Sequence, residues 1–290
     1  MNLKLGAHMS ISGGLHQSLD RVKTIGGNCL QIFSSSPRGW TQIKVAEADK
    51  KLFIDKKKKL QIDPVYFHVS YLVNLADDER IGRSSKNSLI AEMNLASQLG
   101  IRGSIVHLGS FKNEKIQSVD WRTNFQSNPK FKILITNIKN VLQKTPRDTY
   151  FIIENAGNRK IGQNIDEIAT IIKVINDERI KVCLDTCHLF SAGYSLQSEK
   201  ELDSFLSDFD KKIGLNKLDL WHLNDSRDAF NAMRDRHENI GAGTIGLNTF
   251  KLLLNYPKTK DMPFIIETPG FDKKGPDKKN LDILKSLINK

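Results

Sequence analysis

The chain has 290 residues, of which 39% are hydrophobic and 27% are charged, a balance that excludes wholesale disorder and allows a full buried core. Lys and Arg outnumber Asp and Glu by 44 to 33, which gives a formal net charge of +11. A surface this basic attracts polyanions such as nucleic acid or anionic lipid. A lysine-rich surface with no binding role accounts for the charge equally well.

The apolar segments and the cysteine content of the sequence indicate the cellular compartment. No uninterrupted apolar stretch approaches about 18 residues, so no transmembrane helix is expected. The first residues do not have the apolar region of a signal peptide. The three cysteines, Cys29, Cys183 and Cys187, are an odd number in a long chain and indicate a reducing compartment instead of a disulfide scaffold. We therefore expect a cytoplasmic protein that does not bind membranes.

Short apolar runs alternate with amphipathic segments along the whole chain. Runs typical of buried parallel strands lie at 3–7, 29–33, 65–67, 104–106, 150–153, 182–184, 218–221 and 264–266. Helical periodicity lies at 15–25, 46–60, 90–99, 131–142, 165–175, 200–213, 247–254 and 281–288. This alternation predicts one α/β domain over residues 1–290, a (β/α)8 TIM barrel, with a doubly wound open sheet as the alternative. The polar stretch 123–130 is expected to be a loop.

A histidine or a carboxylate follows each of the last six predicted strands. Two further candidates lie between the last two strands, and one lies three residues after Asp185. The complete set is His68, His107, Glu154, Asp185, His188, His222, Asp235, His237 and Glu267. Because barrel strands end at one rim, where active sites of this fold are built, we expect these side chains to meet there.

Imidazoles and carboxylates gathered in this way predict a metal site, most plausibly for zinc. One zinc ion takes about four ligands, so nine candidates indicate two or three ions. Several ions together suit the hydrolysis of phosphate esters. Taken singly the residues are weaker signals: Asp185 and His188 could be an ordinary loop pair, and Arg236 could pair with Asp235. His8 is either a support for the site or a packing residue, and Cys187 is interpreted as packing.

The same residues lie in motifs that resemble the endonuclease IV family of apurinic/apyrimidinic (AP) endonucleases over nearly the whole chain. The most specific stretches read LDTCH at 184–188, HLNDS at 222–226 and DRHENIG at 235–241. Further similar stretches are 6–15, 68–75, 106–110, 153–157, 192–194 and 266–269.

The resemblance implies a TIM barrel with three zinc ions at its rim. His68, His107 and Glu154 would hold the first ion. Glu154 would also reach a second ion, together with Asp185, His222 and Glu267, the four residues expected to act most directly in catalysis. The third ion would be held by His188, Asp235 and His237. The implied reaction is hydrolysis of the phosphodiester 5′ to an abasic site, leaving a 3′-hydroxyl and a 5′-deoxyribose phosphate, with trimming of blocked 3′ ends as a second activity.

The implied substrate is double-stranded DNA, bound by a monomer that associates with the nucleoid when it acts. Arg38, Tyr71 and Leu72 match the side chains that the family inserts into a duplex with a flipped-out nucleotide. The chain departs from the family at Ala242, where Glu is usual, at Asn231 and Ala232, where Gly and Ser are common, and in a longer segment near 118–130. A metal-dependent sugar isomerase or epimerase, or a silent binder of damaged DNA, are the alternatives.

Overall fold

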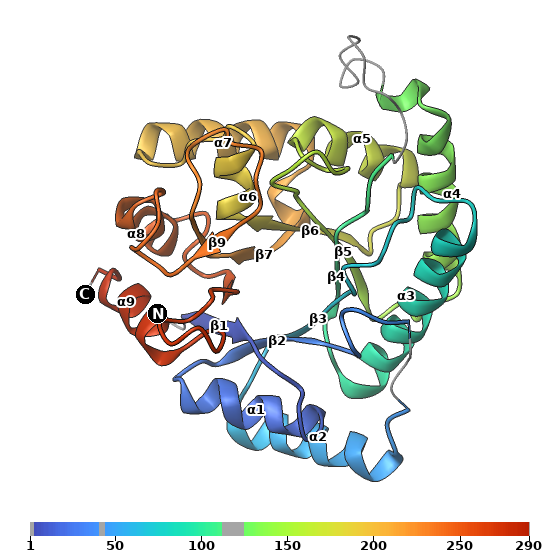
Figure 1. Cartoon of the computed structure of the whole chain (residues 1–290), viewed down its shortest axis with the longest axis horizontal. Coiled ribbons are helices and arrows are strands. Elements are labelled where there is room, and N and C mark those ends of the chain that lie inside the picture. Colours follow the sequence, from blue (N-terminus) through green and yellow to red (C-terminus); the bar gives the residue numbers. More distant parts are fainter. Residues whose placement is uncertain (1–2, 41–43, 112–124, 290) are drawn as a thin grey trace.

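Eight parallel strands close into a barrel in the computed structural model, which describes residues 3–40, 44–111 and 125–289 (Figure 1). Around the barrel the strands follow the order β1-β10-β7-β6-β5-β4-β3-β2, and β2 pairs with β1. The TIM-barrel prediction is therefore confirmed and the open sheet is wrong, because an open sheet would leave two unpaired edges. The barrel strands are β1 (Lys4–His8), β2 (Cys29–Phe33), β3 (Val65–His68), β4 (Gly103–Val106), β5 (Tyr150–Glu154), β6 (Ile180–Asp185), β7 (Leu218–His222) and β10 (Pro263–Ile266).

Helices form a ring outside the strands (Figure 1). The long ones are α1 (Leu15–Thr24), α2 (Glu47–Leu60), α3 (Arg80–Leu99), α4 (Pro129–Gln143), α5 (Ile165–Ile175), α7 (Glu199–Lys212), α8 (Leu247–Asn255) and α9 (Lys278–Ser286). Short elements complete the described chain: α6 (Thr186–Ser191), η1 (Phe125–Ser127), η2 (Leu215–Lys217), β8 (Asp225–Ser226) and β9 (His237–Glu238). None of the described helices combines the length and the apolar character needed to cross a bilayer.

Two predicted boundaries are wrong. Helix α3 begins at Arg80 and not at residue 90; its first turns are polar, so they carry no apolar period that would predict a helix. These turns pack closely on the preceding chain, since a Cβ on Gly82 would lie 1.7 Å from the carbonyl oxygen of Asp77. The expected loop 123–130 is partly helical, since Asn128 caps α4 by accepting from the Lys130 amide at 2.8 Å. The predicted long segment 118–130 lies outside the described residues up to 124.

The interior of the barrel is a packed core with polar groups at both ends. Its middle is filled by buried side chains from seven of the eight barrel strands: Cys29, Tyr66, Ile105, Ile152, Cys183, Leu220 and Ile265. At the amino end of the strands the Tyr66 hydroxyl donates to Asp219 at 3.0 Å, and the Arg102 guanidinium donates to both Asp219 oxygens at 2.7–3.0 Å. This network closes one end, so the opposite rim is where the barrel is open to a substrate.

Candidate metal centre

The carboxyl ends of six neighbouring strands bring six of the predicted residues to one rim. Strands β3, β5, β6 and β7 end in His68, Glu154, Asp185 and His222, while His107 and Glu267 directly follow β4 and β10. Glu154, Asp185 and His222 are fully buried, and His68 is 3% exposed. Buried ionisable groups are retained in proteins only when they are paired or bind ions, so this cluster has a role beyond packing.

His188 reaches the rim through a short helix that the sequence analysis did not predict. Asp185 caps α6, and its Oδ1 accepts from the His188 amide at 2.9 Å. The cap places the two side chains on one side of the first turn, so they are not an ordinary loop pair. Gly157 leaves room for this helix, because a Cβ there would lie 2.9 Å from the Cα of His188.

Asp235 and His237 return to the rim on a two-stranded antiparallel pair. Strand β9 pairs with β8 through Ser226 and His237, and the connecting loop carries Asp235. Arg236 donates to Asp228 at 2.7 Å and not to Asp235, which leaves the Asp235 carboxylate facing the rim. Asn231 in this loop has a φ of 59°, a left-handed conformation that Gly adopts freely and Asn tolerates better than most residues.

Glu154 lies at the middle of the cluster and faces two groups of ligands. Its Oε2 is 3.1 Å from His68 Nε2 and 3.2 Å from His107 Nε2. Its Oε1 is 3.0 Å from His222 Nδ1, which in turn is 3.7 Å from Asp185 Oδ2 and 3.6 Å from Glu267 Oε2. Within each group the donor atoms lie within 4.8 Å of one another, close enough to share one ion. One carboxylate therefore has its two oxygens in two neighbouring donor sets.

A third group lies beside the first two. The donor atoms of Asp185, His188 and His237 lie within 4.8 Å of one another. Asp235 Oδ1 is 3.0 Å from His188 Nε2 and 3.5 Å from His237 Nε2. Asp185 thus borders both this group and the second one.

Backbone carbonyls select which ring nitrogen each histidine offers. His68 Nδ1 donates to the Val69 carbonyl at 2.9 Å, and His188 Nδ1 donates to the Asn155 carbonyl at 2.9 Å. Because a carbonyl can only accept, Nδ1 of both rings carries a hydrogen, and Nε2 is the nitrogen that faces the carboxylates and could bind an ion. His107 also turns Nε2 inward, and its buried Nδ1 has no hydrogen-bond partner among the described residues.

Burial and neighbouring ionisable groups have opposite effects on the pKa values of several residues in the cluster. Burial, with a smaller contribution from His188 and His68, lowers the pKa of His107 to about 4 although Glu154 opposes it, so this ring is neutral and able to ligate at neutral pH. Burial also disfavours the charged form of Glu154, yet His107 and His222 outweigh it and hold the pKa of this carboxyl well below its usual range. His188 and His222 are likewise buried, but the pKa of each is raised well above the usual value, by Asp185 and Asp235 for His188 and by Cys183, Glu267 and Glu154 for His222. Carboxylates and imidazoles that converge in this way fit a first-row divalent cation.

A cavity of about 390 Å³ opens above these groups. Its lining includes Tyr71, which is 67% exposed and packs edge-to-face on Phe33 with ring centroids 5.4 Å apart. Burial of its hydroxyl raises the pKa of Tyr71 to about 12, with Glu267 and Glu154 adding to the effect. Leu72 is 39% exposed, and Arg38 is exposed on the neighbouring loop. The side chains of all three residues predicted to contact DNA are therefore exposed to solvent.

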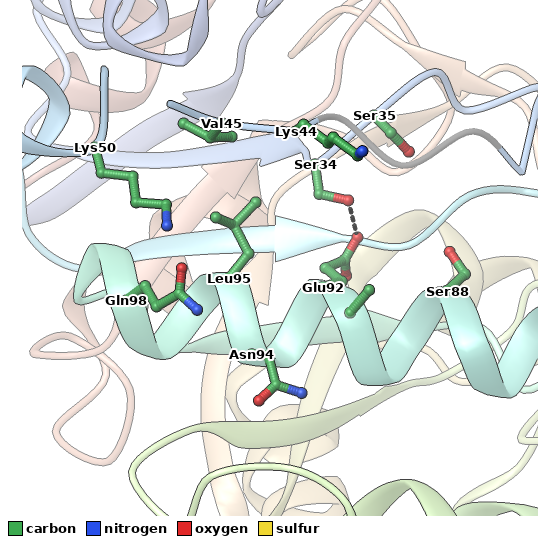
Figure 2. Close-up of a pocket in the computed structure, with 11 residues that line it drawn as sticks. Ser34, Ser35, Lys44, Val45, Lys50, Ser88, Glu92, Asn94, Leu95 and Gln98 are labelled. Carbon is green, nitrogen blue, oxygen red and sulfur yellow. Dashed lines mark hydrogen bonds between the residues drawn. The ribbon is translucent and has the colours of Figure 1, made fainter. Parts of the chain in front are cut away.

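Two buried contacts anchor the loop that carries Arg38. The Ser70 hydroxyl donates to the Pro37 carbonyl at 2.8 Å, and the Ser34 hydroxyl donates to Glu92 Oε2 at 2.5 Å (Figure 2). Burial raises the pKa of Glu92, which borders a second cavity of about 300 Å³ between this loop and α3. Glu92 is the one carboxylate among the described residues that line it, so the metal-ligating groups belong to the rim cavity.

Sequence reasoning missed the amides that hold the carboxylates in place. Asn224 Nδ2 donates to Asp185 Oδ2 at 2.6 Å, and its Oδ1 accepts from the Glu267 amide at 2.7 Å. Asn155 Oδ1 accepts from the Asp185 amide at 2.7 Å. Asn155 directly follows Glu154, and Asn224 lies two residues after His222. Both belong to motifs that resemble the family, and this could have indicated their role. Gln31 is a third such amide and had no signal in the sequence.

The departure at Ala242 removes no ligand. Ala242 is exposed in a turn whose conformation is fixed by the buried Asp225. Asp225 Oδ2 accepts from the amides of Gly241 at 2.9 Å and Gly243 at 3.2 Å. A Cβ on Gly243 would lie 2.4 Å from Asp225 Oδ1, so this glycine is required by close approach.

Comparison with known proteins agrees with the geometry. The family described as Xylose isomerase-like TIM barrel matches residues 19–287. A probable endonuclease 4 of Persephonella marina is 37% identical over 290 residues, covering 99% of this chain and 97% of the relative. The crystal structure of endonuclease IV from Thermus thermophilus matches with a TM-score of 0.83 and 27% identity over 98% of both chains. A 3-keto-D-glucoside 4-epimerase from E. coli, at 14% identity and a TM-score of 0.67 over 98% of this chain and 100% of the other, shares the fold alone.

The closed barrel and its rim of imidazoles and carboxylates thus define a Xylose isomerase-like TIM barrel. The 37% sequence identity with the Persephonella marina relative extends over almost the full length of both chains. The chain belongs to the endonuclease IV family, and the resemblance found in its sequence is confirmed.

Proposed function

We propose that this protein is a zinc-dependent AP endonuclease that cleaves duplex DNA on the 5′ side of abasic sites. The observation that carries the proposal is the arrangement of three neighbouring donor groups, the first two of which share Glu154, at and beneath a single rim cavity. A sugar isomerase or epimerase needs only one or two ions, and the group of His188, Asp235 and His237 would have no use there. Membership of the endonuclease IV family supports DNA as the substrate.

The nine residues would hold three zinc ions in the sets that the family resemblance implies. His68, His107 and Glu154 form one set; Glu154, Asp185, His222 and Glu267 form the second; His188, Asp235 and His237 form the third. Zinc in such sites neutralises the phosphate, lowers the pKa of water and stabilises a leaving alkoxide, which is the chemistry that phosphodiester hydrolysis requires. His107 is neutral at neutral pH and would bind an ion directly, whereas His188 and His222, whose pKa values are raised, would release a proton when an ion binds.

The chain itself would bind and orient the substrate. The rim cavity of about 390 Å³ is within the usual size of small-ligand sites, and an extruded sugar phosphate is of that kind. Tyr71 and Leu72 would fill the gap left in the duplex, and Arg38 would contact the backbone from the adjoining loop. We further propose that the enzyme acts as a monomer in the cytoplasm and also trims blocked 3′ ends.

The test is the incision of a duplex with one abasic site, beside the same duplex intact, by protein of measured zinc content. We expect incision only 5′ to the lesion, with a 3′-hydroxyl end, and loss of incision after chelation with recovery on adding zinc. Absence of incision by zinc-loaded protein would overturn the proposal. Sugar epimerisation would then indicate the alternative enzyme, and selective binding of abasic duplex without turnover would indicate a silent binder.

Tyr71→Ala should weaken binding to abasic duplex more than binding to intact duplex. The expected loss is about 1–3 kcal/mol, because the ring would stack in the gap beside the lesion. Fluorescence anisotropy with both duplexes measures the difference. The matched control is Tyr256→Ala, since Tyr256 bonds to Asp203 on α7 and does not line the rim cavity. An equal loss on both duplexes would make Tyr71 a packing residue.

A further inference from the structure

Gln31 is a buried amide at the heart of the candidate centre. It lies in the middle of β2, has no exposed surface, and is flanked by the buried Leu30 and Ile32. Its Oε1 is 2.7 Å from His222 Nε2. Its Nε2 contacts Glu267 Oε1 and lies 2.8 Å from His8 Nδ1. One side chain thus touches two of the four members of the second donor group.

Chemistry fixes the orientation of this amide. The Glu267 carboxylate can only accept, so the NH₂ group of Gln31 must face it. The carbonyl oxygen then faces His222 and can only accept from that ring. The same NH₂ group has a second hydrogen, which is directed at His8. All polar atoms of Gln31 are therefore used, as is expected of a fully buried amide.

The orientation of Gln31 in turn sets the tautomer of His222. Because Oε1 of Gln31 accepts, Nε2 of His222 carries a hydrogen, and Nδ1 is the nitrogen left to bind an ion. Nδ1 is the nitrogen that faces Glu154 Oε1 at 3.0 Å. His222 thereby differs from His68 and His188, whose Nε2 atoms face inward. In those two rings a backbone carbonyl selects the tautomer, whereas in His222 a side chain does so.

We propose that Gln31 is a positioning residue of the metal centre, which holds His222 in its Nδ1-ligating tautomer and Glu267 in its ligating orientation. The inference rests on the proposed metal centre. Residues that hydrogen-bond to metal ligands typically contribute 10–100-fold to metal affinity. Gln31 contacts a histidine and a carboxylate of the same group, so its loss should loosen the second ion more than the others.

The experiment compares Gln31→Met and Gln31→Glu with the wild-type protein. Methionine has a similar length and no hydrogen bonds to offer, so both roles are lost. Glutamate still accepts from His222 Nε2 but places a like charge beside Glu267, so only the second role is lost. Asn137→Leu is the control, because Asn137 is a buried amide bonded to the carbonyls of Leu75 and Asp77, away from the rim.

Two readouts separate positioning from simple packing. The release of zinc to a chelator should show one ion per chain leaving about 10–100-fold faster in both Gln31 variants, and unchanged kinetics in Asn137→Leu. Long-range ¹H–¹⁵N spectra of ¹⁵N-histidine protein should show His222 protonated on Nε2 in the zinc-loaded wild type and in Gln31→Glu. In Gln31→Met this single-tautomer signal should be lost.

The outcomes distinguish this inference from the proposed function. Failure of the wild-type protein to bind zinc would remove the metal centre itself. Three bound ions with unchanged release from both Gln31 variants, or a wild-type His222 protonated on Nδ1, would overturn the role of Gln31 alone. The wild-type spectrum keeps the test decisive if Gln31→Met does not fold.

Discussion

Glu154→Gln should lower kcat for incision by about 10³-fold or more while binding of abasic duplex is retained. The substitution keeps the shape of the side chain but removes the negative charge that faces two donor groups at once. Removal of a single group that stabilises charge in the transition state commonly costs 10²–10³-fold, and Glu154 would serve two ions. Single-turnover cleavage and an anisotropy titration on the same duplex measure the two quantities separately.

The control for this substitution is Glu201→Gln. Glu201 belongs to the capping box at the start of α7, contacts Ser198 and does not line the rim cavity. Its replacement should leave kcat unchanged and cost about 1 kcal/mol of stability at most. Retention of near-normal turnover by Glu154→Gln would contradict a shared ligand at this position, and an equal loss of binding and turnover would point to a misfolded rim.

Asp219→Ala should lower the free energy of unfolding by about 2–3 kcal/mol. The change leaves the Arg102 guanidinium and the buried Tyr66 hydroxyl without their common acceptor at the closed end of the barrel. Breaking a fully buried pair costs about 3–5 kcal/mol. We expect less here because the Arg102 side chain is 45% exposed and water can solvate it. Urea unfolding followed by circular dichroism gives the value.

Asp208→Ala provides the comparison for that measurement. Asp208 pairs with Lys212 across one turn of α7, and both side chains are partly exposed, so the expected loss is below about 1 kcal/mol. At temperatures where both variants are folded, abasic-site incision should match the wild type, since neither residue touches the rim cavity. Equal stabilities of the two variants would mean that the buried network contributes no more than a surface pair.

The barrel and the ligand set could be predicted because both rest on local pattern. Each strand is a short apolar run, and each candidate ligand follows its run at the same place, so the parallel geometry of the fold brings them together. The same logic fails where a residue departs from the pattern. The first turns of α3 carry no apolar period, so its start at Arg80 could not be read. Helix α6 was missed because six residues are too few for a periodic signal.

Gln31 shows the second limit of sequence reasoning. It lies inside the predicted strand Cys29–Phe33 and is fully buried there. Its partner His222 is 191 residues away, and nothing local indicates that the two meet. The pairing of Arg236 with Asp228, which left Asp235 free, also depends on a turn that the sequence does not specify. Tertiary pairings of this kind require coordinates.

The candidate ligands are spread along most of the chain, which has a consequence for when the metal centre forms during folding. The candidate ligands come from β3, β4, β5, β6, β7, β9 and β10 and the segments next to them, and β1 and β2 complete the closure that aligns these strands. A chain that has folded only β1 to β5 would hold the first donor group, His68, His107 and Glu154, but neither of the other two groups. Nuclease competence would then be reached in the last step of folding. Under the proposed function, partly folded copies would then be unable to cleave DNA.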